Sequence, residues 1–80
     1  MMMNQELATS DLNLAAALSA LGNELIGIDK TDRRRVRFIF RKTQETEAAI
    51  QDYWDNTLKL PAQTLLNAQK ALKTRIYSDV

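Results

Sequence analysis

The stretch RRVRFIFRK at residues 34–42 decides how this chain folds, because basic and apolar residues alternate along it. Successive side chains of a strand point to opposite faces, so the alternation predicts a strand with one buried and one exposed face. We expect the buried face to carry Val36, Phe38 and Phe40. The opposite face then carries Arg35, Arg37, Ile39 and Arg41.

A second predicted strand precedes this one and completes a hairpin. Residues 24–29 also alternate, which places Ile26 and Ile28 on the same face. Residues 29–33 are a short polar connection of the kind that joins two antiparallel strands. The sequence therefore predicts a two-stranded antiparallel β-hairpin in the middle of the chain.

Helical patterns flank the hairpin. The first predicted helix begins near Ser10 or Thr9, with Ser10 as its cap and Asp11 complementing its dipole, and ends at Gly22, where a left-handed cap belongs. The second begins after Thr43 and carries one side made of Ile50, Tyr53, Trp54 and Thr57. The third runs from Pro61 to about Tyr77, with a buried stripe of Leu65, Ala68, Leu72 and Ile76.

The expected fold class is α+β, in the order helix, strand, strand, helix, helix. We expect a single small domain over residues 9–78, preceded by a flexible N-terminal arm at residues 1–8. No stretch approaches the roughly 20 apolar residues of a membrane span, and the first residues lack the pattern of a signal peptide. A cytoplasmic protein without membrane contact is therefore expected.

Composition excludes most catalytic classes. The 80 residues include no Cys and no His, and only two Gly. Such a chain has no disulfide framework, no thiolate nucleophile, no imidazole acid or base and no ordinary zinc site. Two separate glycines do not make a phosphate-binding loop. We therefore expect no enzyme, no catalytic residue, no metal and no cofactor.

The formal charge of +1 hides an uneven distribution. Residues 30–42 hold seven Lys or Arg and one Asp, a net charge of +6, whereas residues 1–29 and 43–56 each carry −4. Guanidinium groups bind phosphate oxygens in a bidentate way and stack on bases. The candidate site for nucleic acid or another anion is therefore Arg33, Arg34, Arg35, Arg37, Arg41 and Lys42.

A structural role explains the same residues. A strand as apolar as residues 36–40 is prone to aggregation at the edge of a sheet, and flanking arginines protect such an edge. Arg35 and Arg37 are also able to pair with the acidic second helix. The sequence leaves the binding and the structural interpretations open.

Four residues are candidates for a protein interface: Leu12, Ala16, Tyr53 and Trp54. The first helix is apolar on more than one face, so it is either sandwiched within the fold or shared with another subunit. Trp54 is expected to anchor the hairpin to the second helix, and Tyr53 is the one able to expose its hydroxyl. Because a domain this small has a limited core, we expect a homo-oligomer, most simply a dimer.

Several short motifs resemble a short family of domains of unknown function found in phage, prophage and bacterial genomes. They are Ser10-Asp11-Leu12-x-Leu14-Ala15-Ala16-x-Leu18 with Gly22, Gly27-Ile28-Asp29-Lys30, Arg35-Val36-x-Phe38-x-Phe40, Tyr53-Trp54, and Leu72-Lys73-x-x-Ile76-Tyr77. Together they span residues 9–77. The resemblance implies a stand-alone phage or mobile-element protein, with no established activity and no catalytic residue to carry over.

Two functions are expected from these observations. The first is a small non-enzymatic accessory protein that binds nucleic acid through an Arg-rich β-hairpin, in the host cytoplasm if a phage encodes it. The second is an oligomeric interaction or inhibitor protein that binds a host protein or an anionic nucleotide signal. A structural subunit that binds no ligand stays open beside these two.

Overall fold

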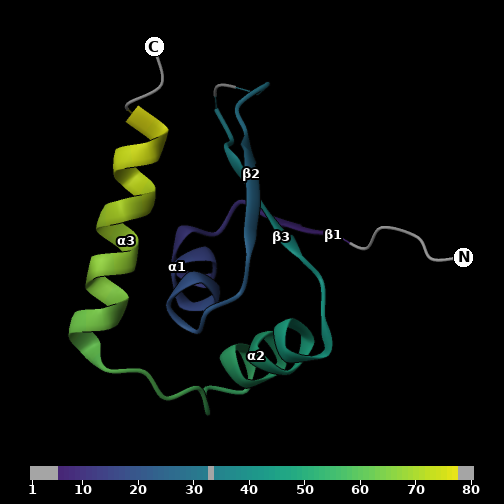
Figure 1. The fold of residues 1–80 in the computed structure, drawn as a ribbon, viewed down its shortest axis with the longest axis vertical. Coiled ribbons are helices and arrows are strands. Elements are labelled where there is room, and N and C mark those ends of the chain that lie inside the picture. The colour runs from purple at the N-terminus through teal and green to yellow at the C-terminus, as the bar shows by residue number, and fades with distance from the viewer. Residues whose placement is uncertain (1–5, 33, 78–80) are drawn as a thin grey trace, which may run out of the picture.

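A computed structural model describes residues 6–32 and 34–77, which fold into a small α+β domain (Figure 1). Its elements are β1 (Glu6–Thr9), α1 (Leu12–Ala20), β2 (Leu25–Asp29), β3 (Arg37–Arg41), α2 (Gln44–Trp54) and α3 (Ala62–Tyr77). The succession α1, β2, β3, α2, α3 confirms the expected order and fold class. Within the described residues, no helix combines the length and the apolar character needed to cross a membrane.

The strand that carries the arginines lies at the centre of the sheet. The strand order is β1-β3-β2, and both neighbours run antiparallel to β3. Phe38 is therefore paired with Thr9 on one side and with Ile28 on the other. The idea that the arginines protect an exposed edge is wrong, because β1 and β2 form the two edges.

Strand β1 is an addition to the predicted hairpin. Residues 6–8 were expected to belong to a flexible arm, but Leu7 pairs with Phe40 and packs against the core. With four residues and a single large apolar side chain, this segment is too short to show a periodic pattern. The rest of the expected arm, residues 1–5, and the expected domain end at residue 78 lie outside the described residues.

Strand β2 contains a bulge that changes which side chains face inward. Leu25 pairs with Phe40 and Gly27 with Ile39, so Ile26 is the extra residue. A bulge inverts the alternation of the strand. Leu25 and Ile28 consequently pack against the core while Ile26 is 44% exposed. The prediction that Ile26 and Ile28 share a face is wrong for this reason.

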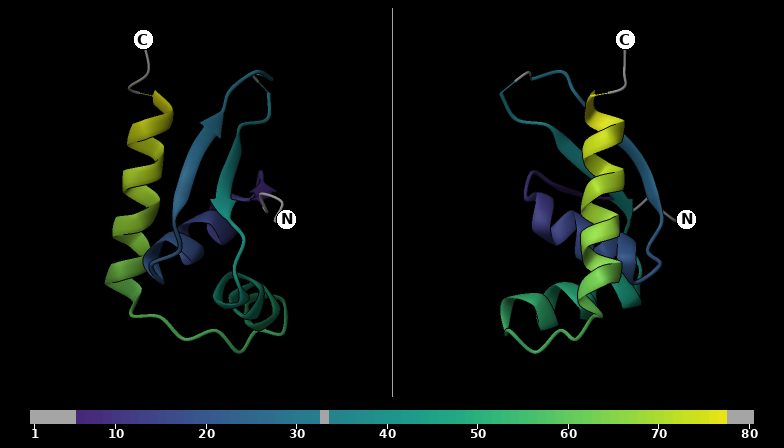
Figure 2. Two further views of the ribbon diagram at one scale, coloured as in Figure 1. Left: turned by 45° about the vertical axis from the view of Figure 1, so that its right-hand side comes forward. Right: turned by 90° about the vertical axis from the view of Figure 1, so that its left-hand side faces the viewer.

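The core forms where the sheet meets α1 and α3. The side chains of Phe38 and Phe40 are buried, as predicted. They form one cluster with Leu18 of α1 and Leu72 of α3. Helix α3 runs along one side of the molecule and packs against α1 (Figure 2). The stripe predicted for α3 is confirmed: Leu72 is buried, and Leu65, Ala68 and Ile76 pack against the core.

Helix α1 is sandwiched within the chain's own fold. Ala16 has an exposed fraction of 0%, and Leu12 is half-buried against the core. A side chain without accessible surface makes no contact with a second subunit unless the fold opens. The structure therefore favours the first of the two roles considered for this helix, and the expected interface position at Ala16 is not available.

The ends of α1 are closed by Asp11 and Gly22. The carboxylate of Asp11 accepts from the backbone N–H groups of Asn13 (2.9 Å) and Leu14 (3.2 Å). The expected cap at Ser10 is wrong, because Asp11 is the last residue before the helix and its carboxylate satisfies these donors. Gly22 has the predicted left-handed conformation, with a φ of +94°.

Helix α2 begins at a capping box, and its buried side includes Ile50 and Tyr53 of the predicted side but not Trp54 or Thr57. Thr43 caps the helix as expected, and its side chain accepts from the N–H of Thr46 (3.1 Å). The inward side runs through Thr46, Ala49, Ile50 and Tyr53. Trp54 is 65% exposed, so the expectation that it anchors the hairpin is wrong. Adjacent residues of a helix point about 100° apart, and Tyr53 takes the inward direction.

Candidate nucleic-acid interface

The basic segment is divided between the two ends of β3. Arg34 and Arg35 follow the turn after β2, Arg37 begins β3, and all three side chains are exposed. We call these three residues the basic tip. Arg33, the remaining arginine predicted for this group, lies outside the described residues. Arg41 and Lys42 lie at the far end of the strand, so the structure does not bring them to the basic tip.

Two carboxylates shape the connection that carries the basic tip. Asp29 accepts from the N–H (2.9 Å) and the hydroxyl (2.6 Å) of Thr31. Asp32 accepts from the N–H of Arg34 (2.9 Å). The hydrogen bonds from Thr31 lower the pKa of Asp29 below its usual value. Both carboxylates thus stabilise the turn, and a hollow of about 320 Å³ next to it is lined by Asp29, Thr31, Asp32, Arg35 and Arg37.

The other end of β3 is neutralised by acidic neighbours. Arg41 Nε donates to Glu24 Oε1 at 2.8 Å, and this contact raises the pKa of Arg41. Lys42 Nζ lies 3.6 Å from Glu47 Oε2 of α2. Arg35 and Arg37 were expected to pair with the second helix, but the ion pair to that helix comes from Lys42. The charge of Arg37 instead adds to the hydrogen bonds from Thr31 in lowering the pKa of Asp29. Arg41 and Lys42 therefore each have an acidic partner that a bound anion would have to replace.

The basic tip and the acidic helix lie at opposite ends of the molecule. Both views of Figure 2 place the β2–β3 connection at one end and α2 at the other. Helix α2 and its C-cap contain Glu45, Glu47, Asp52 and Asp55. A polyanion that approaches the basic tip therefore avoids most of the carboxylates in this segment.

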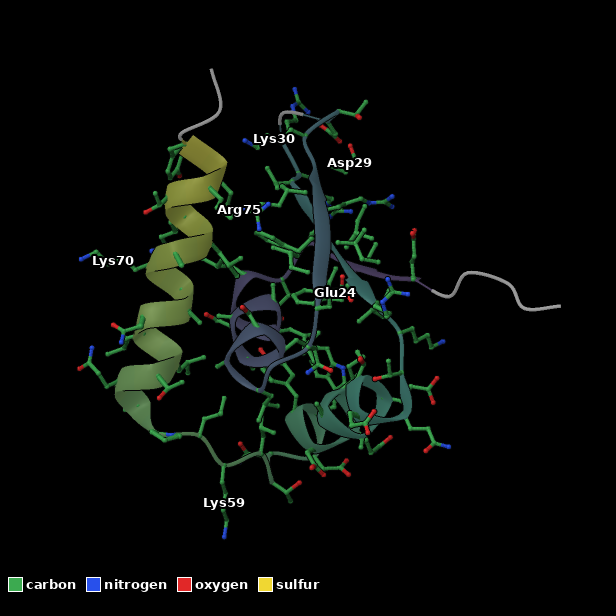
Figure 3. All side chains as sticks on the ribbon, viewed as in Figure 1. Glu24, Asp29, Lys30, Lys59, Lys70 and Arg75 are labelled. Atoms are coloured by element: carbon green, nitrogen blue, oxygen red, sulfur yellow. The ribbon has the colours of Figure 1, made fainter. Side chains whose placement is uncertain are left out.

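A contact distant in sequence brings further basic residues to the same end. Lys30 Nζ donates to the carbonyl oxygens of Arg75 (3.1 Å) and Ile76 (2.9 Å) in the last turn of α3. Figure 3 shows Lys30 and Arg75 on the side of α3 that faces the strands. No sequence pattern links residues 45 positions apart, so this arrangement was not predicted.

The two aromatic residues of α2 border a separate cleft. Tyr53 and Trp54 contact each other edge to face, with ring centroids 5.1 Å apart. The hydroxyl of Tyr53 is not free, because it donates to Asp11 Oδ2 at 3.3 Å. Burial, followed by the charge of Asp11, raises the pKa of Tyr53 above its usual value. The cleft has a volume of about 540 Å³ and is lined by Asn13, Ala17, Tyr53, Trp54, Asn56, Leu58, Leu60 and Leu65.

One buried polar residue has a structural role that sequence reasoning missed. The hydroxyl of Thr46 lies 2.8 Å from Asn23 Oδ1 and 3.0 Å from the carbonyl oxygen of Arg41. It also accepts from the N–H of Thr43 at 3.3 Å. Thr46 therefore fixes the start of α2 against the end of β3 and the chain that follows α1. The third position of a helix usually holds Glu or Gln when a capping box forms. The Thr at this position therefore did not indicate a capping box in the sequence.

Comparison with known proteins identifies a family. Searches against curated proteins and against solved structures found no match. Residues 4–78 match a family described as a domain of unknown function, in agreement with the resemblance seen in the sequence. That match covers nearly all of the 80 residues. The chain therefore belongs to the family Domain of unknown function (DUF5659).

Proposed function

We propose that this protein binds nucleic acid through the basic tip and does not act as an enzyme. The observation that supports the proposal is the position of Arg34, Arg35 and Arg37, which are exposed at the end of the molecule opposite to α2. Phosphate oxygens accept hydrogen bonds from guanidinium groups, and a projecting two-stranded ribbon is narrow enough to enter a major groove. Phosphate contacts give affinity and orientation without sequence preference.

The cellular setting is part of the same proposal. A chain of 80 residues without His or Cys suits an accessory protein better than a catalyst. We place it in the cytoplasm, as a protein of a phage or another mobile element that acts on nucleic acid there. No cofactor is needed for this function.

Salt dependence tests the proposal. Fluorescence anisotropy with a labelled DNA duplex should show binding at low salt that weakens as salt rises, because phosphate contacts release counterions. Three phosphate contacts predict a loss of affinity of roughly 40-fold between about 50 and 200 mM salt. A duplex that does not bind at low salt overturns the proposal.

A mononucleotide serves as the competitor in the same assay. A protein that reads a polyanion through several phosphates is displaced by unlabelled duplex and not by an equal concentration of phosphate groups supplied as mononucleotide. Displacement by the mononucleotide at low concentration would instead indicate the anionic-nucleotide ligand, held in the hollow beside Arg35 and Arg37.

A further inference from the structure

The outward side of α3 forms a shallow groove that carries positive charge. The groove has a volume of about 520 Å³ and is lined by Leu66, Gln69, Lys70, Lys73, Thr74 and Tyr77. We call these six residues the α3 groove. Figure 3 shows Lys70 pointing away from the body of the protein. Helix α3 contains three basic residues and neither Asp nor Glu, and Asp79, which follows it in the sequence, lies outside the described residues.

The two lysines of the α3 groove are exposed to an approaching anion. Among the described residues, neither Lys70 nor Lys73 forms an ion pair, whereas Arg41 and Lys42 each have an acidic partner. Residues three positions apart share a face of a helix and are separated by about 4.5 Å along its axis. Lysine binds phosphate as a point charge. The α3 groove therefore offers two neighbouring contacts to a phosphate backbone.

An exposed aromatic ring lies at one end of the α3 groove. Tyr77 is 81% exposed, more than any other large hydrophobic side chain in the described part of the chain. Aromatic rings beside a basic groove are the platforms on which proteins stack unpaired bases. Phe38 and Phe40 are buried and cannot serve in this way. Bases within a duplex already stack on one another, so an exposed ring next to lysines suits an unpaired strand.

A contact between distant segments places the α3 groove next to the basic tip. Lys30 of the β2–β3 connection donates to the carbonyl oxygen of Ile76, the residue before Tyr77, at 2.9 Å. The connection and the end of α3 therefore lie at the same end of the molecule (Figure 2). Arg75 is found on the side of α3 that faces the strands, whereas Lys70 points the other way (Figure 3). A strand that leaves the basic tip thus passes Tyr77 before it reaches the lysines.

We propose that the α3 groove binds an unpaired strand that continues from the duplex at the basic tip, an inference that rests on the proposed function. Lys70 and Lys73 contact neighbouring phosphates, and the ring of Tyr77 stacks on a base. The helix from Leu66 to Tyr77 is about 16 Å long, and a stacked strand rises about 3.4 Å per nucleotide, so the groove accommodates about five nucleotides. The preferred substrate is then a junction between duplex and single strand.

Fluorescence anisotropy with three labelled DNAs at low salt tests the α3 groove. The first is a blunt duplex, and the second adds an overhang of about ten thymidines at its 5′ or its 3′ end. The third is a blunt duplex lengthened by about half as many base pairs, which adds the same number of phosphates. One of the two overhangs should bind at least fivefold more tightly than the lengthened duplex, because stacking on Tyr77 adds to the phosphate contacts.

Aromatic substitutions test the stacking. Tyr77→Ala should remove most of the gain that the overhang gives, and Tyr77→Phe should retain it because the ring is kept. Trp54→Ala is the matched control: it removes another exposed aromatic ring, on α2 at the opposite end of the molecule, and should leave the gain unchanged. Circular dichroism confirms that the variants are folded. Equal losses in Tyr77→Ala and Trp54→Ala overturn the inference.

Lysine substitutions test the phosphate contacts. The double variant Lys70→Gln, Lys73→Gln should lower the slope of log affinity against log salt by about 1.4 for the overhang DNA, the value for two contacts to a single strand. Its binding to the blunt duplex should stay close to that of the parent chain. An unchanged slope with the overhang DNA overturns the inference.

The same three DNAs separate this inference from the proposed function. Binding to the blunt duplex without any gain from either overhang overturns the inference alone. Binding that requires the overhang and is lost in Tyr77→Ala supports the α3 groove and overturns the contact of the basic tip with duplex. A chain that binds none of the DNAs at low salt overturns both proposals.

Discussion

Lys30 Nζ donates a 2.9 Å hydrogen bond to the carbonyl oxygen of Ile76, which joins the β2–β3 connection to the last turn of α3. The final carbonyl groups of a helix lack partners within the helix and form the negative end of its dipole. A lysine from a distant segment therefore satisfies them and stabilises the helix end. The same contact determines where the basic tip lies relative to α3.

Lys30→Met should loosen this end of the molecule. The substitution retains the apolar part of the side chain and removes the donor, so we expect a loss of about 1 kcal/mol in the free energy of unfolding. Urea titration measures it, and amide exchange should accelerate in the last turn of α3. Lys59→Met, in the exposed connection before α3, should change stability by less than about 0.5 kcal/mol. Equal losses in the two variants would show that the contact contributes nothing.

Thr46 is expected to be more sensitive to loss of its hydroxyl than to loss of its methyl group. Thr46→Val leaves the side-chain oxygen of Asn23 and the N–H of Thr43 without this partner, at a cost of roughly 1–3 kcal/mol. Thr46→Ser retains the hydroxyl and loses one methyl group, about 1 kcal/mol. Urea unfolding of both variants ranks them. A valine variant more stable than the serine variant contradicts the role assigned to the hydroxyl.

The two glycines should respond in opposite directions to alanine. Gly22 has a φ of +94°, in the region that L-residues rarely adopt, so Gly22→Ala should lose about 1 kcal/mol. No atom lies within 4 Å of a Cβ built on Gly27, whose φ is not in that region. Gly27→Ala should therefore gain about 0.5 kcal/mol by restricting the unfolded chain. Thermal unfolding of the two variants compares them, and a loss at Gly27 would show that the bulge tolerates no side chain.

Stability should fall at high pH through Tyr53. Its raised pKa means that the folded chain holds the phenol proton to a higher pH than the unfolded chain does. The unfolded pKa is about 10, so stability is unaffected below that pH and decreases as pH rises above it. Tyr53→Phe should remove this part of the decrease in urea titrations. Because the chain has two tyrosines, Tyr77→Phe leaves Tyr53 alone for an absorbance titration, and a midpoint at or below pH 10 would contradict the prediction.

The sequence predicted best those elements whose pattern is long and regular. The alternation at residues 34–42 identified the strand and its buried Phe38 and Phe40, because several large apolar side chains repeat with the same period. Strand β1 escaped notice because Leu7 is its one large inward side chain. In β2, a single extra residue at Ile26 reversed the faces of the strand, and the alternation of residues 24–29 gave no sign of it.

The candidate site was predicted less completely, because it depends on contacts between distant segments. The local charge identified the arginines, but not which of them lie together. That depends on contacts such as the ion pair of Arg41 with Glu24 and the hydrogen bond from Lys30 to α3. The sequence predicted that Trp54 packs inward and Tyr53 is exposed, whereas the structure shows the reverse. Two neighbouring residues of a helix share the same periodic pattern, so the pattern does not say which of them points inward. Leu58 and Leu60 line the cleft from a connection without periodic structure, so no pattern indicated them.

The proposed function rests most directly on a comparison of the two ends of β3 in duplex binding at low salt. The variant Arg34→Gln, Arg35→Gln, Arg37→Gln removes three charges at the basic tip. The variant Arg41→Gln, Lys42→Gln removes charges that acidic neighbours already balance. We predict that the first variant loses most of its affinity and that its slope of log affinity against log salt decreases by about 3. The second variant should bind almost as tightly as the parent chain, whereas equal losses in both, or full binding by the first, would contradict binding through the basic tip.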